Sequence, residues 1–153
     1  MKSTICKIAI SVILSCFILF PLSAKQLFVS PEGDDSADGS SSGNAFKTLS
    51  KAVDAAEEGD EIVLLGIIDI SQEPADKIYN SDAYNKNNQG VKILDKGLTI
   101  SGDPNQTRTK TGFTGNKTTT CLRLDGLNKK VTIRNLTIKE GNPTSDKGAG
   151  SYT

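Results

Sequence analysis

Phe46-Lys-Thr-Leu-Ser-Lys-Ala-Val-Asp-Ala-Ala-Glu-Glu-Gly-Asp-Glu-Ile-Val-Leu-Leu65 is the stretch of sequence that decides the fold. Its first part carries apolar side chains at helical spacing, which predicts an amphipathic helix over residues 47–58. These side chains are Leu49, Ala52, Val53 and Ala56. The last part, from Glu61 to Leu65, is an apolar run of strand length, and we expect a strand that is buried on both sides.

The two ends of this helix also follow from the sequence. Thr48 or Ser50 can accept a hydrogen bond from the free N–H groups at its start. Gly59 suits the left-handed backbone that often follows a helix end. We therefore expect Leu49 and Val53 to cover one end of the apolar core that the following strand begins.

Short strands with alternating apolar residues recur along the rest of the chain. They are Gln26–Ser30, Val91–Leu94, Leu98–Ile100, Cys121–Leu124, Val131–Ile133 and Leu136–Ile138. Strands this short do not form stable hairpins alone, but stacked coil on coil they can bury one continuous apolar column. Asn135 fits a tight bend between two of them, because Asn tolerates the left-handed region. The pattern predicts an all-β solenoid with one N-terminal capping helix, and a β-sandwich is the alternative.

The first 24 residues have the features of a secretory signal peptide. Lys2 and Lys7 form a basic head, residues 8–20 are nearly all apolar, and Ala24 closes a small-residue cleavage site. An uncleaved anchor and lipidation at Cys16 are the alternatives. We expect cleavage after Ala24, and a mature chain that is secreted or held at the cell surface without a membrane span of its own.

The mature chain, residues 25–153, has the length of one domain. Cleavage removes two lysines and no acid, so 18 basic and 18 acidic residues become 16 and 18, a net charge of about −2. This balance gives no electrostatic footprint for nucleic acid. The chain contains no histidine, and Cys121 is the one cysteine left after cleavage, so no internal disulfide forms.

Several motifs resemble those of a known group of proteins. Phe28-Val-Ser-Pro-Glu-Gly-Asp-Asp35, Ala45-Phe-Lys-Thr-Leu-Ser-Lys-Ala-Val53 and Gly59-Asp-Glu-Ile-Val-Leu64 are similar to the N-terminal signature of right-handed parallel β-helix proteins with the pectin-lyase-like fold. Gly148-Ala-Gly150 resembles the glycine-rich turns of polymorphic outer-membrane proteins and adhesin-like autotransporter passengers. The resemblance implies a right-handed parallel β-helix, with residues 25–153 as the N-terminal cap and first coils of a longer column.

This fold hosts both adhesins and enzymes, so two classes of function stay open. One is a non-catalytic, adhesin-type passenger whose partner is a host surface or a polysaccharide. The other is the N-terminal part of a polysaccharide lyase or glycoside hydrolase, which the resemblance also allows. We expect Arg123 and Arg134 to point outward, but without a matching cluster of strand carboxylates, because Asp125 falls in a turn and Glu140 follows the last strand. The sequence therefore favours the non-catalytic role and indicates no catalytic or cofactor-binding residue.

Three aspartates form a candidate metal site in a loop of Gly, Ser and acidic residues. Asp34, Asp35 and Asp38 could supply hard oxygen ligands to a calcium ion. The same residue types are ordinary turn formers, whose side chains bond their own backbone, and this is the alternative we favour.

The last coil of a stacked column leaves strand edges and apolar side chains without a neighbour, which invites association. We therefore expect end-to-end self-association of the mature chain. Light scattering over a range of protein concentrations should show a mass that rises with concentration. A stable monomer at every concentration would contradict this expectation.

Overall fold

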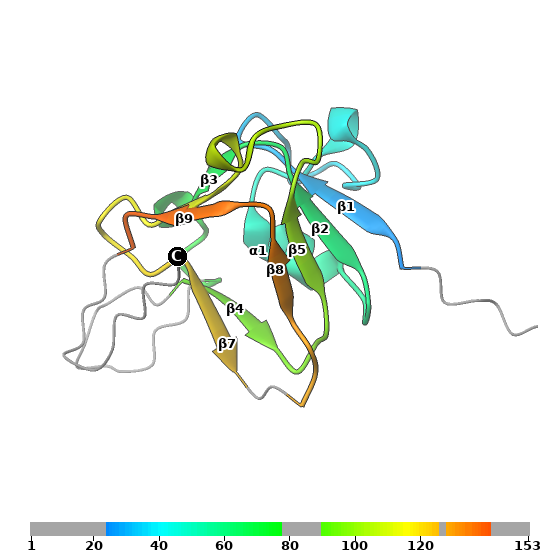
Figure 1. The fold of residues 1–153 in the computed structure, drawn as a ribbon. Helices are drawn as coiled ribbons and strands as arrows, with labels where there is room; N and C mark the ends of the chain where they lie inside the picture. Colours follow the sequence, from blue (N-terminus) through cyan, green and yellow to red (C-terminus); the bar gives the residue numbers. More distant parts are fainter. Residues whose placement is uncertain (1–23, 78–89, 126–127, 142–153) are drawn as a thin grey trace, which may run out of the picture.

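The computed structural model describes residues 24–77, 90–125 and 128–141 (Figure 1). Most of the predicted signal peptide, residues 1–23, and the Gly148-Ala-Gly150 turn lie outside them. The elements described are β1 (Gln26–Val29), η2 (Ser42–Asn44), α1 (Leu49–Ala55), β2 (Glu61–Leu64), β3 (Ile67–Asp69), η3 (Ile70–Gln72), β4 (Val91–Leu94), β5 (Thr99–Gly102), η4 (Arg108–Lys110), β6 (Gly112–Thr114), β7 (Leu122–Asp125), β8 (Thr132–Arg134) and β9 (Thr137–Lys139). None of the described helices is long and apolar enough to cross a membrane.

The strands form three parallel sheets that surround a common interior (Figure 1). Their orders are β1-β2-β5-β8, β3-β6-β9 and β4-β7. The chain visits the three sheets in the same order on successive passes, first through β2, β3 and β4 and then through β5, β6 and β7. Each strand from β2 onward therefore pairs with strands one pass earlier or later, and β1, which precedes the first full pass, pairs with β2.

The core is built from apolar side chains that the parallel register stacks on one another. Leu27 pairs with Ile62, and Ile62 pairs with Ile100. All three are almost fully buried and belong to one cluster with side chains from the other two sheets. Because side chains alternate along a strand, this inward row leaves the intervening residues facing outward.

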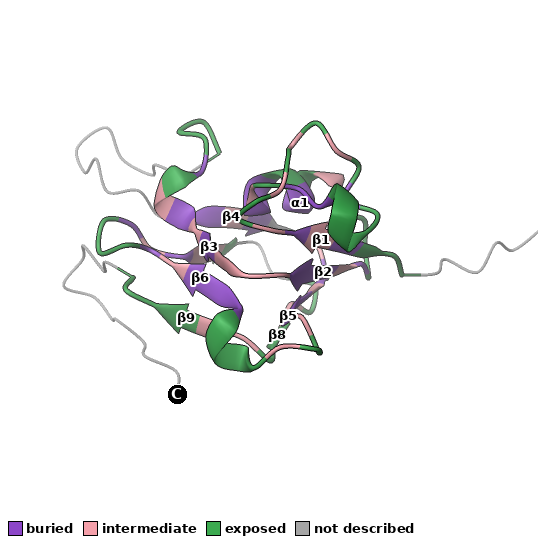
Figure 2. Ribbon diagram, turned by 90° about the horizontal axis from the view of Figure 1, so that it is seen from above, coloured by how far each residue is buried: buried purple, intermediate pink, exposed green. Residues whose placement is uncertain are grey.

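Helix α1 covers the end of the core opposite β9 (Figure 2). Leu49 is fully buried and Val53 is 7 % exposed, as expected from the helical spacing. The Thr48 hydroxyl accepts a hydrogen bond from the Lys51 N–H, so the predicted cap at Thr48 is confirmed. The helix ends at Ala55, earlier than predicted, and Gly59 adopts a φ of 89° in the turn that follows.

A buried carboxylate also holds the start of α1. Glu73 accepts hydrogen bonds from the Leu49 N–H at 2.7 Å, from the Ser50 N–H at 3.1 Å and from the Ser50 hydroxyl. Burial raises the pKa of Glu73 above its ordinary value of 4.5, although these hydrogen bonds act in the opposite direction. Glu73 thereby ties the chain after β3 to the helix that covers the core.

The expected fold class, an all-β right-handed parallel β-helix solenoid, is wrong. Strands account for only about 30 % of the described chain, and the fold is mixed α/β with parallel sheets. The passes are also irregular: 38 and 33 residues separate paired positions in the first sheet, from Glu61 to Thr99 to Thr132. Long connections of uneven length therefore replace the constant repeat that a solenoid needs. The parallel strands in sheets are compatible with a β-helix, and the resemblance seen in the sequence is supported only to that extent.

The individual strands are predicted better than the architecture. Each of the six alternating segments corresponds to a strand, most of them shifted by one residue. Strand β6 is not evident from the sequence, because Gly112 and Thr114 surround a single buried apolar residue, Phe113. Asn135 adopts a φ of 52°, as its place between two strands predicts.

Within the described ranges, the large apolar side chains that are exposed lie on the last strands of the three sheets. Leu124 and Ile133 are each 39 % exposed, and Ile138 is 53 % exposed. End-to-end self-association through this part of the molecule stays a prediction.

Burial of Leu49 predicts a strong contrast between two neighbouring substitutions. Leu49→Asp places an uncompensated charge in the core and should lower the free energy of unfolding by about 3–5 kcal/mol. Lys51→Asp changes an exposed residue of the same helix and should cost less than about 0.5 kcal/mol. Urea unfolding measures both. Equal stability of the two variants would show that α1 does not cover the core.

Candidate functional site

The outward face of the β1-β2-β5-β8 sheet carries a groove of about 320 Å³. Its floor includes Phe28 and Val63, which are paired in register on β1 and β2. The turn from Asp103 to Asn105, directly after β5, lines one side. The groove therefore combines all four strands of the sheet with the turns that follow β5 and β8.

Glu61 is the centre of the polar network in this groove. Its carboxylate accepts hydrogen bonds from the Arg134 guanidinium at 2.6 Å, from the Ser101 hydroxyl at 2.7 Å and from the Gln26 amide at 3.1 Å. These donors lie on β8, β5 and β1, so one carboxylate joins all four strands of the sheet. The Arg134 side chain is 61 % exposed and that of Glu61 is 18 % exposed. The guanidinium thus remains accessible from solvent while it holds the carboxylate.

The hydrogen bonds decide the charge of Glu61. Burial acts to raise its pKa, but the bonds from Gln26, Ser101 and Arg134, together with the positive charge of Arg134, outweigh burial and lower the pKa below 4.5. Glu61 is therefore ionised at neutral pH, and its oxygens act only as acceptors.

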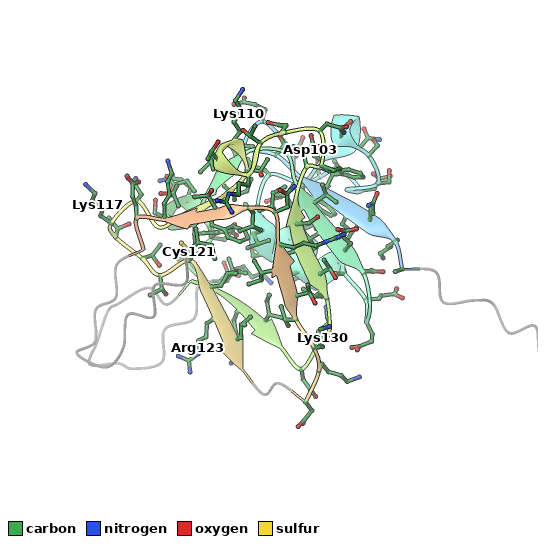
Figure 3. The ribbon with its side chains drawn as sticks, viewed as in Figure 1. Asp103, Lys110, Lys117, Cys121, Arg123 and Lys130 are labelled. Carbon is green, nitrogen blue, oxygen red and sulfur yellow. The ribbon has the colours of Figure 1, made fainter. Side chains whose placement is uncertain are left out.

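A second carboxylate, that of Asp103, shapes the side of the groove (Figure 3). It accepts hydrogen bonds from the Asn105 N–H at 2.8 Å and from the side-chain amides of Asn105 and Gln106. The bond from the Asn105 backbone lowers the pKa of Asp103. Gln106 also donates to the Leu65 carbonyl at 3.0 Å, which fixes the turn against the chain after β2.

Close backbone contact sets the edge of the groove where β5 ends. A Cβ atom at Gly102 would lie 2.1 Å from the Asn135 carbonyl oxygen and 2.2 Å from the Thr111 hydroxyl oxygen. Only glycine fits at this position. The side-chain amide of Asn135 in turn donates to the Gly102 carbonyl at 3.4 Å, so the turn after β8 lies directly against β5.

A broader hollow of about 920 Å³ adjoins the groove on the side of β1. Both hollows are lined by Gln26, Phe28 and Glu61, and the broader one continues to Asp38 and the segment 40–42. Phe28 is half-buried and lies where the two hollows meet. The surface could therefore hold an extended ligand across this aromatic ring.

The outward arginines of the sequence analysis have different surroundings. Arg134 lies in the groove, whereas Arg123 lies on β7 in another sheet. The sequence predicts no cluster of strand carboxylates beside Arg134, and it does not reveal that one such carboxylate, Glu61 on β2, bonds to it. The predicted burial of this strand on both sides is confirmed at Ile62, Val63 and Leu64. Glu61 at its start is partly exposed, and its polar side chain is the signal for this in the sequence.

The three aspartates of the candidate calcium site all accept hydrogen bonds from nearby protein groups. Asp34 accepts from the Ser36 N–H at 2.8 Å, and Asp38 accepts from the Ser40 N–H at 2.9 Å, as turn-forming residues do. Asp35 instead accepts from the backbone at the start of α1, with the Thr48 N–H at 2.9 Å. Within the described residues, no group of three or more His, Cys, Asp or Glu could hold a metal ion.

Cys121 lies just before β7 and is 6 % exposed (Figure 3). Burial raises the pKa of its thiol to about 11, so it stays protonated at neutral pH. This agrees with a packing role for the thiol.

No protein-family model, curated protein or solved structure matches this chain. Fold-level kinship therefore adds nothing to the groove, and its function has to follow from its own residues.

Glu61 and Glu73 predict opposite effects of pH on stability. The lowered pKa of Glu61 gives a contribution that is present above 4.5 and is lost as the pH falls below that value. The raised pKa of Glu73 gives a contribution that is present below 4.5 and is lost as the pH rises through the folded-state pKa. The measurement is urea unfolding of the natural chain, Glu61→Gln and Glu73→Gln between about pH 3 and about pH 7, a range that includes these pKa values. The free energies of unfolding should show both pH effects.

The stability advantage of the natural chain over Glu61→Gln should shrink at acid pH and amount to about 1 kcal/mol or less at neutral pH, because Arg134 is largely exposed. Its advantage over Glu73→Gln should grow at acid pH. Slopes of the same sign for the two variants would contradict the assignment.

Proposed function

We propose that this chain is an exported, surface-exposed binding protein that holds a polysaccharide in the groove of the β1-β2-β5-β8 sheet without catalysing a reaction. The observation that carries the proposal is the Glu61 network beside Phe28. It presents fixed hydrogen-bonding groups next to an aromatic ring, on a face that is open to solvent.

The chemistry of the groove fits the hydroxyl groups and ring faces of a sugar. Its polar side chains are mostly planar amides, carboxylates and a guanidinium, which offer both donors and acceptors in fixed geometry. Phe28 and Pro104 offer apolar surface against which the C–H face of a sugar ring can pack. Sites of this kind combine an apolar lining with a few fixed polar groups.

Charge favours a neutral polymer over an acidic one. The groove contains two carboxylates, Glu61 and Asp103, and one guanidinium, Arg134. Both carboxyl groups have lowered pKa values, so the groove carries one net negative charge at neutral pH. An anionic chain would meet repulsion that a neutral chain avoids.

Binding is better supported than the alternative, the N-terminal part of a polysaccharide lyase or glycoside hydrolase. Glycoside hydrolysis needs one carboxylic acid that is still protonated at working pH. The pKa values of Glu61 and Asp103 are both lowered, which removes them as acids. Arg134 cannot act as a base while it remains charged and bonded to Glu61.

Export of the protein is proposed from the basic head, apolar run and small-residue site of residues 1–24. An exposed polar groove in a secreted protein would meet extracellular glycans or a host surface. The proposal therefore combines a location predicted from the sequence with a ligand class chosen from the groove.

The polysaccharide proposal is tested with a panel of immobilised polymers and the exported protein. The neutral members are xylan, mannan, dextran and β-glucan, and the acidic members are polygalacturonate and alginate. We expect binding to at least one neutral polymer and weaker binding to the acidic ones. Phe28→Ala and Arg134→Gln should each weaken binding about tenfold or more, which corresponds to about 1.4 kcal/mol.

Lys139→Gln is the matched control, because it removes one exposed positive charge from β9 in a different sheet. Its affinity should equal that of the natural chain. Failure of every polymer to bind, or binding that is insensitive to Phe28 and Arg134, would overturn the proposal. Stronger binding to the acidic polymers would refute the charge argument.

A further inference from the structure

The backbone nitrogen of Lys25 lies against a buried carboxylate. It donates a hydrogen bond to Asp60 Oδ1 at 2.9 Å, and the Lys25 carbonyl accepts from the Glu61 N–H at 3.0 Å. The parallel pairing of β1 with β2 begins at the next residue, where Gln26 pairs with Glu61. Lys25 is therefore the residue through which the chain enters the sheet.

Asp60 is only 3 % exposed. Its second oxygen, Oδ2, accepts from the Glu57 N–H at 2.7 Å and lies 3.6 Å from Lys25 Nζ. A buried carboxylate is costly unless it is both hydrogen-bonded and paired with a positive charge. In the uncleaved chain, the group on Oδ1 is a neutral amide. Among the residues that the structure describes, the half-exposed Lys25 ammonium then supplies the positive charge.

The bond before this nitrogen is the one that the sequence predicts to be cut. Ala24 closes the small-residue site of the signal peptide and is exposed. Hydrolysis uses one water, whose hydroxyl bonds to the Ala24 carbonyl carbon. The bond from this carbon to the Lys25 nitrogen breaks, and Ala24 ends in a carboxylate. The Lys25 nitrogen takes the protons and becomes an α-ammonium at neutral pH.

We propose that cleavage after Ala24 completes the Asp60 site, because it places the new α-ammonium of Lys25 in an ion pair with the buried Asp60 carboxylate. Processing then changes the neutral hydrogen bond on Oδ1 into a charge-assisted one at the same position. The inference rests on the predicted cleavage position and is independent of what the groove binds.

The ion pair has a consequence for the site on the sheet. β1 is the edge strand of its sheet and carries Gln26 and Phe28 of the groove. An anchor at Lys25 fixes the start of this strand. The exported chain is accordingly more stable than a chain that continues on the N-terminal side of Lys25.

The test is a cycle of four proteins. Two begin at Lys25 after export, and two are made without the signal peptide and retain one methionine in place of Ala24; each pair has either Asp60 or Asp60→Asn. With Asp60, the melting temperature of the exported chain should exceed that of the extended chain by roughly 5 °C, the shift expected for one favourable charge pair in a small domain. With Asp60→Asn, the two chains should melt together, within roughly 1 °C.

Glu57→Gln is the control for general charge effects, because Glu57 is exposed and lies 4.0 Å from Lys25 Nζ. It should leave the difference between exported and extended chains intact. A difference that persists in Asp60→Asn, or no difference in the natural chain, would overturn the proposal. An exported chain that begins at another residue, as measured by mass spectrometry, would also overturn it.

A second measurement covers the case in which Asp60→Asn does not fold. The pKa of the Lys25 α-amine can be measured in the natural exported chain by pH-dependent labelling. The charged groups that face it are Asp60, its own Nζ ammonium and, through Nζ, Glu57. Pairing with Asp60 should raise this pKa above the ordinary value of about 7.7–8.0. A value at or below that range would contradict the ion pair.

Discussion

Parallel stacking of short strands in a fixed register is the interaction on which the rest of this molecule depends. Leu27, Ile62 and Ile100 lie on one another in successive strands of the first sheet and form a continuous inner row. None of these strands is longer than four residues, so none could persist without the strand above or below it. Helix α1 covers one end of this row. Asp35 and Glu73 accept hydrogen bonds from the backbone at the start of the helix. The fold is thus stabilised mainly between passes of the chain.

The same register creates the groove. If Ile62 lies on Ile100 inside the sheet, the side chains on the outer face also align, so that Ser101 and Arg134 lie in one row with Val63. Glu61, two residues before Val63, then reaches both of them diagonally. Glu61 and Arg134 are 73 residues apart in the sequence, yet they bond across β5. The same strand register therefore determines both the packing of the core and the polar network of the groove. The anchor at Lys25 and Asp60 extends it to the edge strand that carries Phe28.

The sequence predicts features that depend on neighbouring residues and misses those that depend on register. The cap at Thr48, the buried face of α1 and the bend at Asn135 follow from local chemistry, and the structure has all three. The fold class was wrong because alternating segments reveal strands but not the uneven loops between them, which leave strands a minor share of the chain. The pairing of Glu61 with Arg134 was missed for a related reason. It depends on connection lengths, and no pattern within either segment records them.

Contacts between methyl groups in the inner row test the stacking most directly. In a sample with labelled isoleucine methyls, nuclear Overhauser effects should connect Ile62 with Ile100 and Ile100 with Ile133, because each pair is in register on adjacent strands. Ile62 and Ile133 should show no direct contact, since β5 lies between their strands. Absence of the first two contacts, or a direct contact between Ile62 and Ile133, would contradict the parallel register and the groove built on it.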